Sequence, residues 1–216
     1  MALSPPPRDR ILHAARELFF QQGYARVSTD ALARAAAVSK ATLYKHFPGM
    51  EALLRAVVER EVDGFERGVP MAVGTPGEFR SALVYYGANL LVFLNQSDII
   101  HFAQLMFEEA RGNGGLAADF YESAYGRTQN DLARLIQQGL DRVYLGSNLT
   151  APELAEQLLG LWEGFGFVRA LLGLTPRPFP NPWEWSEACV HTFLAGQASN
   201  PPPSPWPLPT CRSSGS

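Results

Sequence analysis

The chain has 216 residues, of which 46% are hydrophobic and 18% are charged, so it can bury a core and is not a wholly disordered chain. No apolar run reaches the roughly 20 residues that a membrane-spanning helix needs, and the proline-rich start lacks the apolar segment of a signal peptide. Its two cysteines, Cys189 and Cys211, exclude a disulfide framework, and we expect a cytoplasmic protein with no membrane partner.

The net charge of −3 conceals an uneven distribution along the chain. Residues 8–60 contain nine Lys and Arg against five Asp and Glu, a balance of +4, whereas the rest of the chain has nine against sixteen, a balance of −7. A basic N-terminal part followed by a larger acidic part is typical of a nucleic-acid-binding domain joined to a second domain. A balance of +4 is modest enough to arise by chance, so charge alone does not decide the function.

Helical spacing and capping residues predict four helices in the first third of the chain. After a disordered arm over residues 1–7, a helix is expected over 8–22, ended by Gly23. A short second helix starts at Ser28 or Thr29, and a third runs from Ser39 to Phe47. The connection between these two is about three residues long, which favours a helix-turn-helix, and a longer helix follows over 50–67.

The rest of the chain also has helical signals. The Gly- and Pro-rich segment 68–77 is the expected domain boundary, and further helices are predicted over 77–95, 98–111, 116–145, 151–173 and 183–197. Alternating patterns are nearly absent, so strands are not expected. The Pro-rich residues 198–216 predict a disordered tail. The sequence therefore predicts an all-α fold with an N-terminal domain over 8–67 and a larger domain over 77–197.

Residues 8–56 contain the most specific pattern in the chain. Gly23-Tyr24 ends the first helix, and the runs VSTDALARAA (27–36), VSKATLYKHF (38–47) and MEALL (50–54) follow it. In order and spacing this segment resembles the DNA-binding domain of the tetracycline-repressor (TetR/AcrR-type) family. One departure is Ala37, where the family often has Gly in the turn. The segment from about Phe102 to Leu172 resembles the AefR-like subgroup of the family.

The resemblance implies which residues contact DNA. In a recognition helix one face is buried and the other presents polar groups to the major groove, and here Leu43 and Phe47 are the inward candidates. The family pattern places Lys40, Ala41 and Thr42 at base edges, and Ser28, Thr29, Tyr44 and His46 at phosphates. Both lysines of the chain, Lys40 and Lys45, lie in this helix, and we expect Lys45 to contact a phosphate. The full expected DNA-binding set is Ser28, Thr29, Ser39, Lys40, Ala41, Thr42, Tyr44, Lys45 and His46.

The larger domain has two apolar stripes, which predict either a dimer interface or an ordinary monomer core. Periodicity does not separate these alternatives. The family resemblance favours a homodimer in which two helices from each subunit form a four-helix interface. The expected interface residues are Leu154, Leu158, Leu161, Phe165, Val168, Leu172, Trp185, Cys189 and Phe193.

A ligand pocket is expected among the aromatic residues of the larger domain, because small-molecule sites are apolar cavities with a few polar groups. Many aromatics fall on its predicted helices, among them Phe93, Phe120 and Phe167, and the polar candidates include Gln104 and Glu163. The predicted pocket set is Tyr85, Asn89, His101, Phe102, Leu105, Tyr121, Tyr125, Trp162, Phe165 and Arg169. This composition favours a hydrophobic effector of unknown identity.

The chain lacks a Gly-rich phosphate loop, a Ser-His-Asp signature, a His-x-x-x-His pair and a Cys-x-x-Cys pair, so we expect no enzyme, no metal and no cofactor. The expected function is a homodimeric transcriptional repressor, released from a palindromic operator in double-stranded DNA by a small molecule. The alternative is a helix-turn-helix regulator that has no inducing ligand or that depends on a corepressor.

Overall fold

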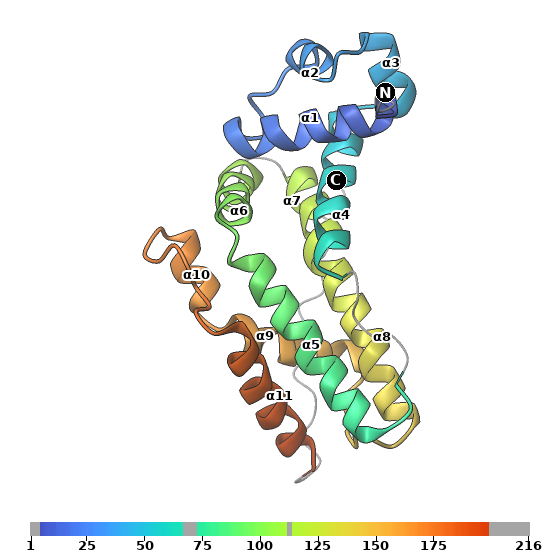
Figure 1. Ribbon diagram of the computed structural model, residues 1–216, viewed down its shortest axis with the longest axis vertical. Coiled ribbons are helices and arrows are strands. Elements are labelled where there is room, and N and C mark those ends of the chain that lie inside the picture. Colours follow the sequence, from blue (N-terminus) through green and yellow to red (C-terminus); the bar gives the residue numbers. More distant parts are fainter. Residues whose placement is uncertain (1–4, 67–72, 112–113, 199–216) are drawn as a thin grey trace.

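The computed structural model describes residues 5–66, 73–111 and 114–198, and within these ranges the fold is all-α, as predicted (Figure 1). The N-terminal helices are α1 (Pro7–Gln22), α2 (Thr29–Ala35), α3 (Lys40–His46) and α4 (Met50–Glu66). The remaining elements are α5 (Pro76–Leu94), α6 (Ser97–Ala110), α7 (Gly114–Tyr121), the π-helical turn η1 (Glu122–Gly126), α8 (Arg127–Asp141), α9 (Ala151–Glu163), α10 (Gly166–Leu171) and α11 (Pro182–Ala198).

The predicted terminal segments fall mostly outside the described residues. Of the arm predicted over 1–7, residues 1–4 lie outside the described ranges, and Pro7 is already the first residue of α1. Of the tail predicted over 198–216, only residue 198 is described, at the end of α11. The predicted domain boundary at 68–77 also lies partly outside, because the described chain resumes at Val73.

Side chains that satisfy backbone groups mark the beginnings of α2, α3, α5 and α9. The Ser28 hydroxyl accepts a hydrogen bond from the Ala31 N–H at 3.2 Å, and the Ser39 hydroxyl accepts one from the Thr42 N–H at 3.0 Å. α5 begins with a capping box between Thr75 and Glu78, and Thr150 and Glu153 form another at α9. These local interactions are the reason that sequence patterns located the helix starts.

Two predicted helices are interrupted. The helix expected over 116–145 contains η1, whose π-helical turn lies between α7 and α8. The helix expected over 151–173 is broken at Gly164, where the backbone has a φ of 44°, so that α9 and α10 are separate helices. Positive φ values favour glycine, which explains why the chain turns at this position. The apolar stripe from Leu154 to Leu172 is therefore not continuous.

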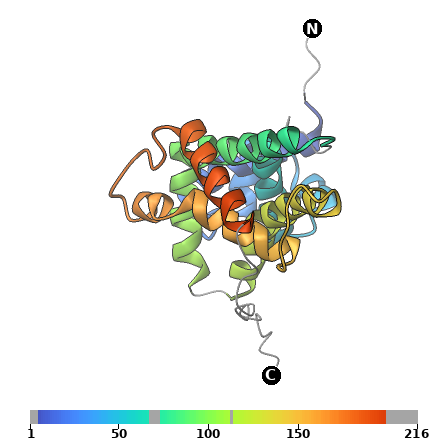
Figure 2. The same cartoon turned by 90° about the horizontal axis from the view of Figure 1, so that it is seen from below.

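The helices form two packed units joined by α4. α1, α2 and α3 pack together at one end of the molecule, and α4 extends from them along the larger helical unit (Figure 1). In that unit α11 lies beside α5 and α9, and α8 packs on α9 (Figure 2). α1 also contacts α6, so the small unit is attached to the larger one at two places, through α4 and through α6.

The largest buried side chain of the C-terminal unit is Trp162, which lies between α5 and α11. Its indole stacks with Tyr86 at a centroid distance of 6.1 Å. A Cβ at Gly87 would come within 2.2 Å of the indole and within 2.5 Å of the Ser186 hydroxyl, so this close packing requires glycine. Among the described residues, no single helix has the length and apolar character needed to cross a membrane, although α5 and α6 together, bent by 75°, meet that criterion.

Candidate DNA interface and ligand cavity

α3 buries one face and exposes the other. Leu43 and Phe47 are buried, at 1% and 3% exposure, and pack in the core formed with α1 and α2. The polar side of the helix is open: Lys40, Tyr44 and Lys45 are exposed, as is the small side chain of Ala41. Thr42 and His46 are partly exposed. An exposed polar helix that follows a supporting helix after a short turn is the arrangement by which helix-turn-helix proteins enter the major groove.

Two of the residues expected at base edges have partners within the protein. The Lys40 ammonium pairs with the Asp30 carboxylate of α2 at 2.8 Å, and the hydrogen bond to Asp30 raises the pKa of Lys40. The hydroxyls of Ser39 and Thr42 lie 2.9 Å apart. Both contacts are at the exposed N-terminal end of α3, so binding to DNA would exchange surface interactions of small energy for contacts to bases.

The turn between α2 and α3 contains a conformation that is unfavourable for its residue. Ala37 has a φ of 51°, in the left-handed region that residues other than glycine rarely adopt. The Ala37 carbonyl accepts a hydrogen bond from the Arg10 guanidinium at 3.3 Å, and the Val38 N–H donates to the Ala33 carbonyl at 3.0 Å. These bonds hold the turn in the geometry that glycine would adopt without strain.

A cavity of about 290 Å³ lies in the larger unit, lined by residues of α4, α5, α6, α7, η1, α8, α9 and α10. Its surface is mostly apolar, and six aromatic side chains contribute to it: Phe93, Phe102, Phe120, Tyr121, Tyr125 and Phe167. The charged lining residues are all carboxylates, namely Glu61, Glu156 and Glu163. Tyr125 belongs to η1, and π-helical turns are frequent at functional sites.

The structure brings together only some of the residues predicted for the pocket. Phe102, Tyr121 and Tyr125 line the cavity. Phe165 and Arg169 line a separate, more open hollow next to α11, and Trp162 packs in the core against Tyr86. The remaining four lie outside both: Tyr85, Asn89, His101 and Leu105.

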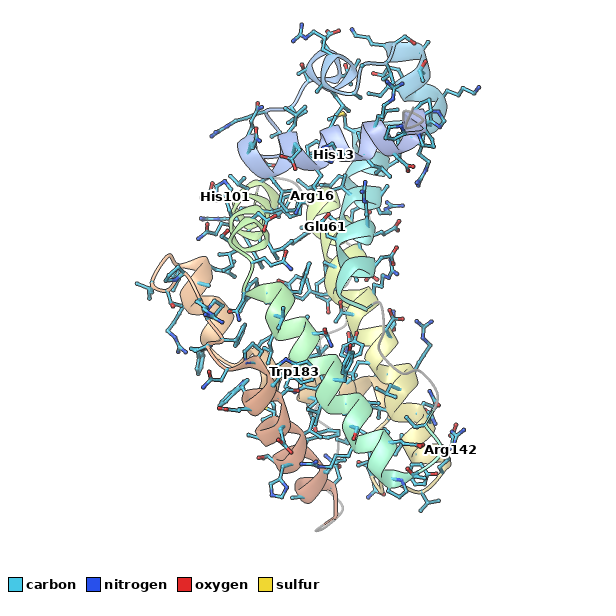
Figure 3. The ribbon with its side chains drawn as sticks, in the orientation of Figure 1. His13, Arg16, Glu61, His101, Arg142 and Trp183 are labelled. Atoms are coloured by element: carbon cyan, nitrogen blue, oxygen red, sulfur yellow. The ribbon has the colours of Figure 1, made fainter. Side chains whose placement is uncertain are left out.

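The four residues outside both hollows either contact other parts of the protein or are exposed to solvent. Tyr85 lies edge-to-face with Trp183 at 5.5 Å, and the Asn89 amide donates to the Tyr85 carbonyl at 2.7 Å. His101 is exposed on α6 (Figure 3). Leu105 approaches Gly23, at the junction of α6 and α1. Helical spacing placed them on plausible helices but did not show which face of each helix borders the cavity.

Sequence reasoning missed the contribution of α4 to the cavity. Val58, Glu61 and Val62 are cavity residues, although their helix was assigned to the N-terminal domain. Val58 and Val62 lie in the apolar stripe of that helix, which was the available signal, but the stripe does not say what it packs against.

Glu163 is the most strongly perturbed acid of the cavity. Burial raises its pKa from the ordinary 4.5 to about 7, because a carboxylate loses solvation there. Burial also raises the pKa of Tyr125, with the nearby Glu163 charge adding to the effect. No hydrogen bond or ion pair joins Glu163 to another residue within the described ranges. A partly buried carboxylate without a protein partner, on a residue that lines an apolar cavity, indicates a position where a ligand can supply the missing partner.

The cavity touches the DNA-binding unit through Glu61. The Arg16 guanidinium of α1 donates to the Glu61 carboxylate at 2.9 Å and to the Asp98 carboxylate of α6 at 2.5 Å (Figure 3). The same guanidinium lies 4.4 Å from the centroid of the Phe20 ring. Arg16 therefore joins α1 to both α4 and α6, and of its three carboxylate partners, Glu17, Glu61 and Asp98, Glu61 is part of the cavity wall.

A second connection is aromatic. Phe20 of α1 stacks on Phe102 at a centroid distance of 4.2 Å, and Phe102 meets Phe120 edge-to-face at 6.0 Å. Phe120 in turn contacts Tyr125 at 6.2 Å. Three of these four rings, those of Phe102, Phe120 and Tyr125, line the cavity. A ligand that moves the Phe102 or Phe120 ring would therefore also change the contact between Phe102 and Phe20 of α1.

The structure divides the predicted dimer residues into two groups. Leu154, Leu158, Cys189 and Phe193 are buried within the subunit and are not accessible to a second chain in this conformation. Leu161, Phe165, Val168, Leu172 and Trp185 are exposed, with Phe165 at 79% and Leu172 at 68%. The break at Gly164 and the packing of α9 on α8 and α11 decide this division, which a continuous stripe could not reveal.

The fold and the exposed α3 define a helix-turn-helix DNA-binding protein with a second domain that contains a cavity. Comparison with protein families agrees: the model for bacterial regulatory proteins of the tetR family matches residues 11–57. The model for the C-terminal domain of AefR-like transcriptional repressors matches residues 81–196, more than half of the chain. The chain belongs to the TetR family of transcriptional regulators, in the group with an AefR-like C-terminal domain.

Individual relatives resemble different parts of the chain. The HTH-type transcriptional regulator UidR of Escherichia coli is 45% identical over 53 residues, which are 24% of this chain and 27% of UidR. The HTH-type transcriptional activator FasR of Mycolicibacterium smegmatis is 40% identical over 76 residues, 35% of each chain. The chain thus matches only about a quarter to a third of the length of these curated relatives. The solved structure of the flavonoid-responsive regulator FrrA matches with a TM-score of 0.71 and 29% identity, over 88% of this chain and 96% of FrrA.

Proposed function

We propose that the protein is a homodimeric repressor that binds a palindromic operator through α3 of each subunit and is released when a small hydrophobic ligand fills the cavity. The observation that carries this proposal is the shared position of Glu61, which lines the cavity and also holds Arg16 of the DNA-binding unit. Such a protein acts on chromosomal DNA, and we place it in the cytoplasm.

Operator recognition would divide between base and phosphate contacts. Lys40, Ala41 and Thr42 lie in the first turn of α3, the part of a recognition helix that approaches base edges. Tyr44, Lys45 and His46 lie further along the helix, where we expect them to contact the phosphate backbone of the DNA. The free N–H groups at the start of α2, next to Ser28 and Thr29, suit a phosphate.

Dimerisation would use the exposed apolar residues Leu161, Phe165, Val168, Leu172 and Trp185. These large apolar side chains are exposed on α9 and α11 and within or next to α10, and exposed apolar residues of this kind are typical of a subunit interface. A suitable test is Val168→Asp, with Val92→Asp as the matched control, because these valines are 47% and 46% exposed on different helices. Sedimentation should show monomers for Val168→Asp alone, and a dimer in both variants would overturn this interface.

Ligand release would act through α1. A ligand that stabilises a different position of Glu61 or Phe102 favours a state in which α1, and with it α3, has moved. In a symmetric dimer the two recognition helices must be about 34–36 Å apart to enter successive major grooves, so a small displacement is sufficient to weaken binding.

The first experiment is selection of duplex DNA from a random pool by the purified full chain, followed by titration of the selected DNA with candidate ligands. We expect enrichment of a palindrome and loss of binding with an effective ligand. Enrichment only in the presence of a ligand would support the corepressor alternative. No enrichment at low salt, from a folded dimer, would overturn the proposed recognition.

The coupling route has its own test. Arg16→Gln removes the ion pairs to Glu61 and Asp98, together with the one to Glu17 of the same helix, and we expect it to reduce the effect of a ligand on operator affinity about fivefold, within the usual range for coupling residues. Arg80→Gln is the control, because Arg80 pairs with Glu187 at 3.0 Å between α5 and α11, away from the cavity lining. If the ligand changes operator affinity by the same factor in both variants, Arg16 does not connect ligand binding to DNA binding.

A further inference from the structure

We infer that the cavity selects an organic cation, an amine or related nitrogen base attached to an apolar aromatic or aliphatic body, and that Glu163 is its counter-ion. This inference rests on the proposed function only in taking the cavity as the effector site. It goes beyond the expectation of a hydrophobic ligand, since it assigns the sign of the ligand's charge and the residue that recognises it.

The first support is the sign of the charges around the cavity. Three glutamates line it, and no Lys, Arg or His is found among the lining residues that the structure describes. Glu61 is already paired with Arg16, whereas neither Glu156 nor Glu163 has a hydrogen-bond or ion-pair partner within the described ranges. An acidic ligand would add a further negative charge to this apolar space, which is costly without a cationic partner.

The second support is the combination of carboxylates with aromatic rings. The faces of Phe and Tyr rings attract cations, and the attraction is largest where water is excluded. Six aromatic side chains line the cavity together with Glu163. One of them, Tyr125, is close enough to Glu163 for the glutamate charge to raise the pKa of its hydroxyl group. An ammonium group would gain a carboxylate partner and ring faces at the same time, while its apolar body would fill the rest of the cavity.

The third support is that Glu163 lacks a structural reason for its position. It is the last residue of α9, directly before the break at Gly164, and it lines both the cavity and the adjacent hollow. A glutamine or an apolar residue would avoid the cost of removing part of a carboxylate's hydration there. An acidic side chain retained without an internal partner is therefore best explained by a partner that arrives from outside.

The test uses three probes with the same naphthyl body and different polar groups: 1-naphthylmethylammonium, 1-naphthylmethanol and 1-naphthylacetate. Calorimetric titration of the full chain at pH 8 measures the affinity of each. We expect the ammonium compound to bind at least tenfold more tightly than the alcohol, and the carboxylate to bind most weakly. A neutral flavanone is added as a fourth probe, because the structurally similar FrrA is described as flavonoid-responsive.

Two variants assign the preference to a residue. Glu163→Gln keeps the shape of the side chain and removes its charge, so the ammonium compound should lose most of its advantage while the affinity of the alcohol stays within twofold. Glu184→Gln is the matched control, because Glu184 lines the adjacent hollow and not the cavity. The inference is overturned if the ammonium compound binds no better than the alcohol or does not bind, if the flavanone is the tightest probe, or if Glu163→Gln leaves the preference unchanged.

The same probes separate this inference from the proposed function. Operator affinity is measured with each compound at saturation. A cation that binds through Glu163 and leaves operator affinity unchanged supports the ligand class and overturns the role of the cavity in release. A neutral or acidic compound that binds and releases the operator supports the proposed function and overturns the ligand class.

Discussion

The DNA-binding unit and the cavity domain place their functional groups in opposite environments. In α3 the residues expected to contact DNA are exposed or partly exposed, and the folding contacts come from other positions such as Leu43 and Phe47. In the cavity domain the same side chains that would meet a ligand also build the interior, as Phe102 and Phe120 do. Substitutions of the exposed α3 side chains should therefore change affinity with little effect on stability, whereas substitutions of the cavity side chains should change both.

The largest expected effect is on packing in the cavity domain. Gly87→Ala places a methyl group 2.2 Å from the Trp162 indole, and we expect it to lower the free energy of unfolding by roughly 3 kcal/mol. The matched control is Gly77→Ala in the same helix, which has no neighbour within 4 Å and should be neutral or stabilising. Denaturant titration measures both, and equal stability of the two variants would contradict the packing shown here.

The next effect depends on pH. The Glu163 carboxyl titrates near 4.5 in the unfolded chain and near 7 in the folded one, so the unfolded chain loses its proton first and stability falls as pH rises between these values. Above pH 7 the loss is complete. Glu163→Gln should be about 2 kcal/mol more stable than the parent at pH 8, allowing for partial exposure of the side chain, and equal to it near pH 4. Thermal unfolding at several pH values measures this, and a constant difference across pH would refute it.

In the DNA-binding unit the effect should appear in affinity alone. Lys40→Ala or Thr42→Ala should weaken binding to the selected operator by about 1–3 kcal/mol and relax base preference, with unfolding unchanged. Binding to operators with single-base changes measures the preference. A uniform loss on every sequence would assign these residues to the phosphate backbone.

Lys45→Ala tests whether Lys45 contacts a phosphate and not a base. A phosphate contact contributes to all sequences alike, so this variant should weaken binding evenly and reduce the slope of log affinity against log salt by about one. Measurements at several salt concentrations decide the point. A sequence-dependent loss would instead place Lys45 at a base edge.

The smallest effect concerns the turn of the DNA-binding unit. Ala37→Gly relieves the left-handed conformation at φ 51° and should stabilise the protein by about 0.5–1 kcal/mol, since part of the gain is offset by the greater freedom of glycine when unfolded. Thermal unfolding measures the gain, and operator affinity should stay the same. Destabilisation would show that the surrounding hydrogen bonds remove the strain at Ala37.

Agreement between sequence and structure is closest where interactions are local. The starts of α2 and α3 were predicted from Ser28 or Thr29 and from Ser39, because a capping side chain acts on backbone groups only a few residues away. The inward positions Leu43 and Phe47 follow from helical periodicity in the same way. The sequence by itself thus determined the all-α class, the helix-turn-helix and the side of α3 that is exposed.

Only the tertiary structure decided the cavity and the surfaces of the larger domain. Several helices contribute to the cavity, and whether Trp162 or Glu163 borders it depends on how α9 is rotated against α5, η1 and α11. Periodicity shows that a helix has an apolar face, but the partner of that face lies far away in sequence. For that reason Leu154 and Leu158 are core residues, Leu161 and Phe165 are exposed, and the link from Glu61 to Arg16 became visible only in the folded chain.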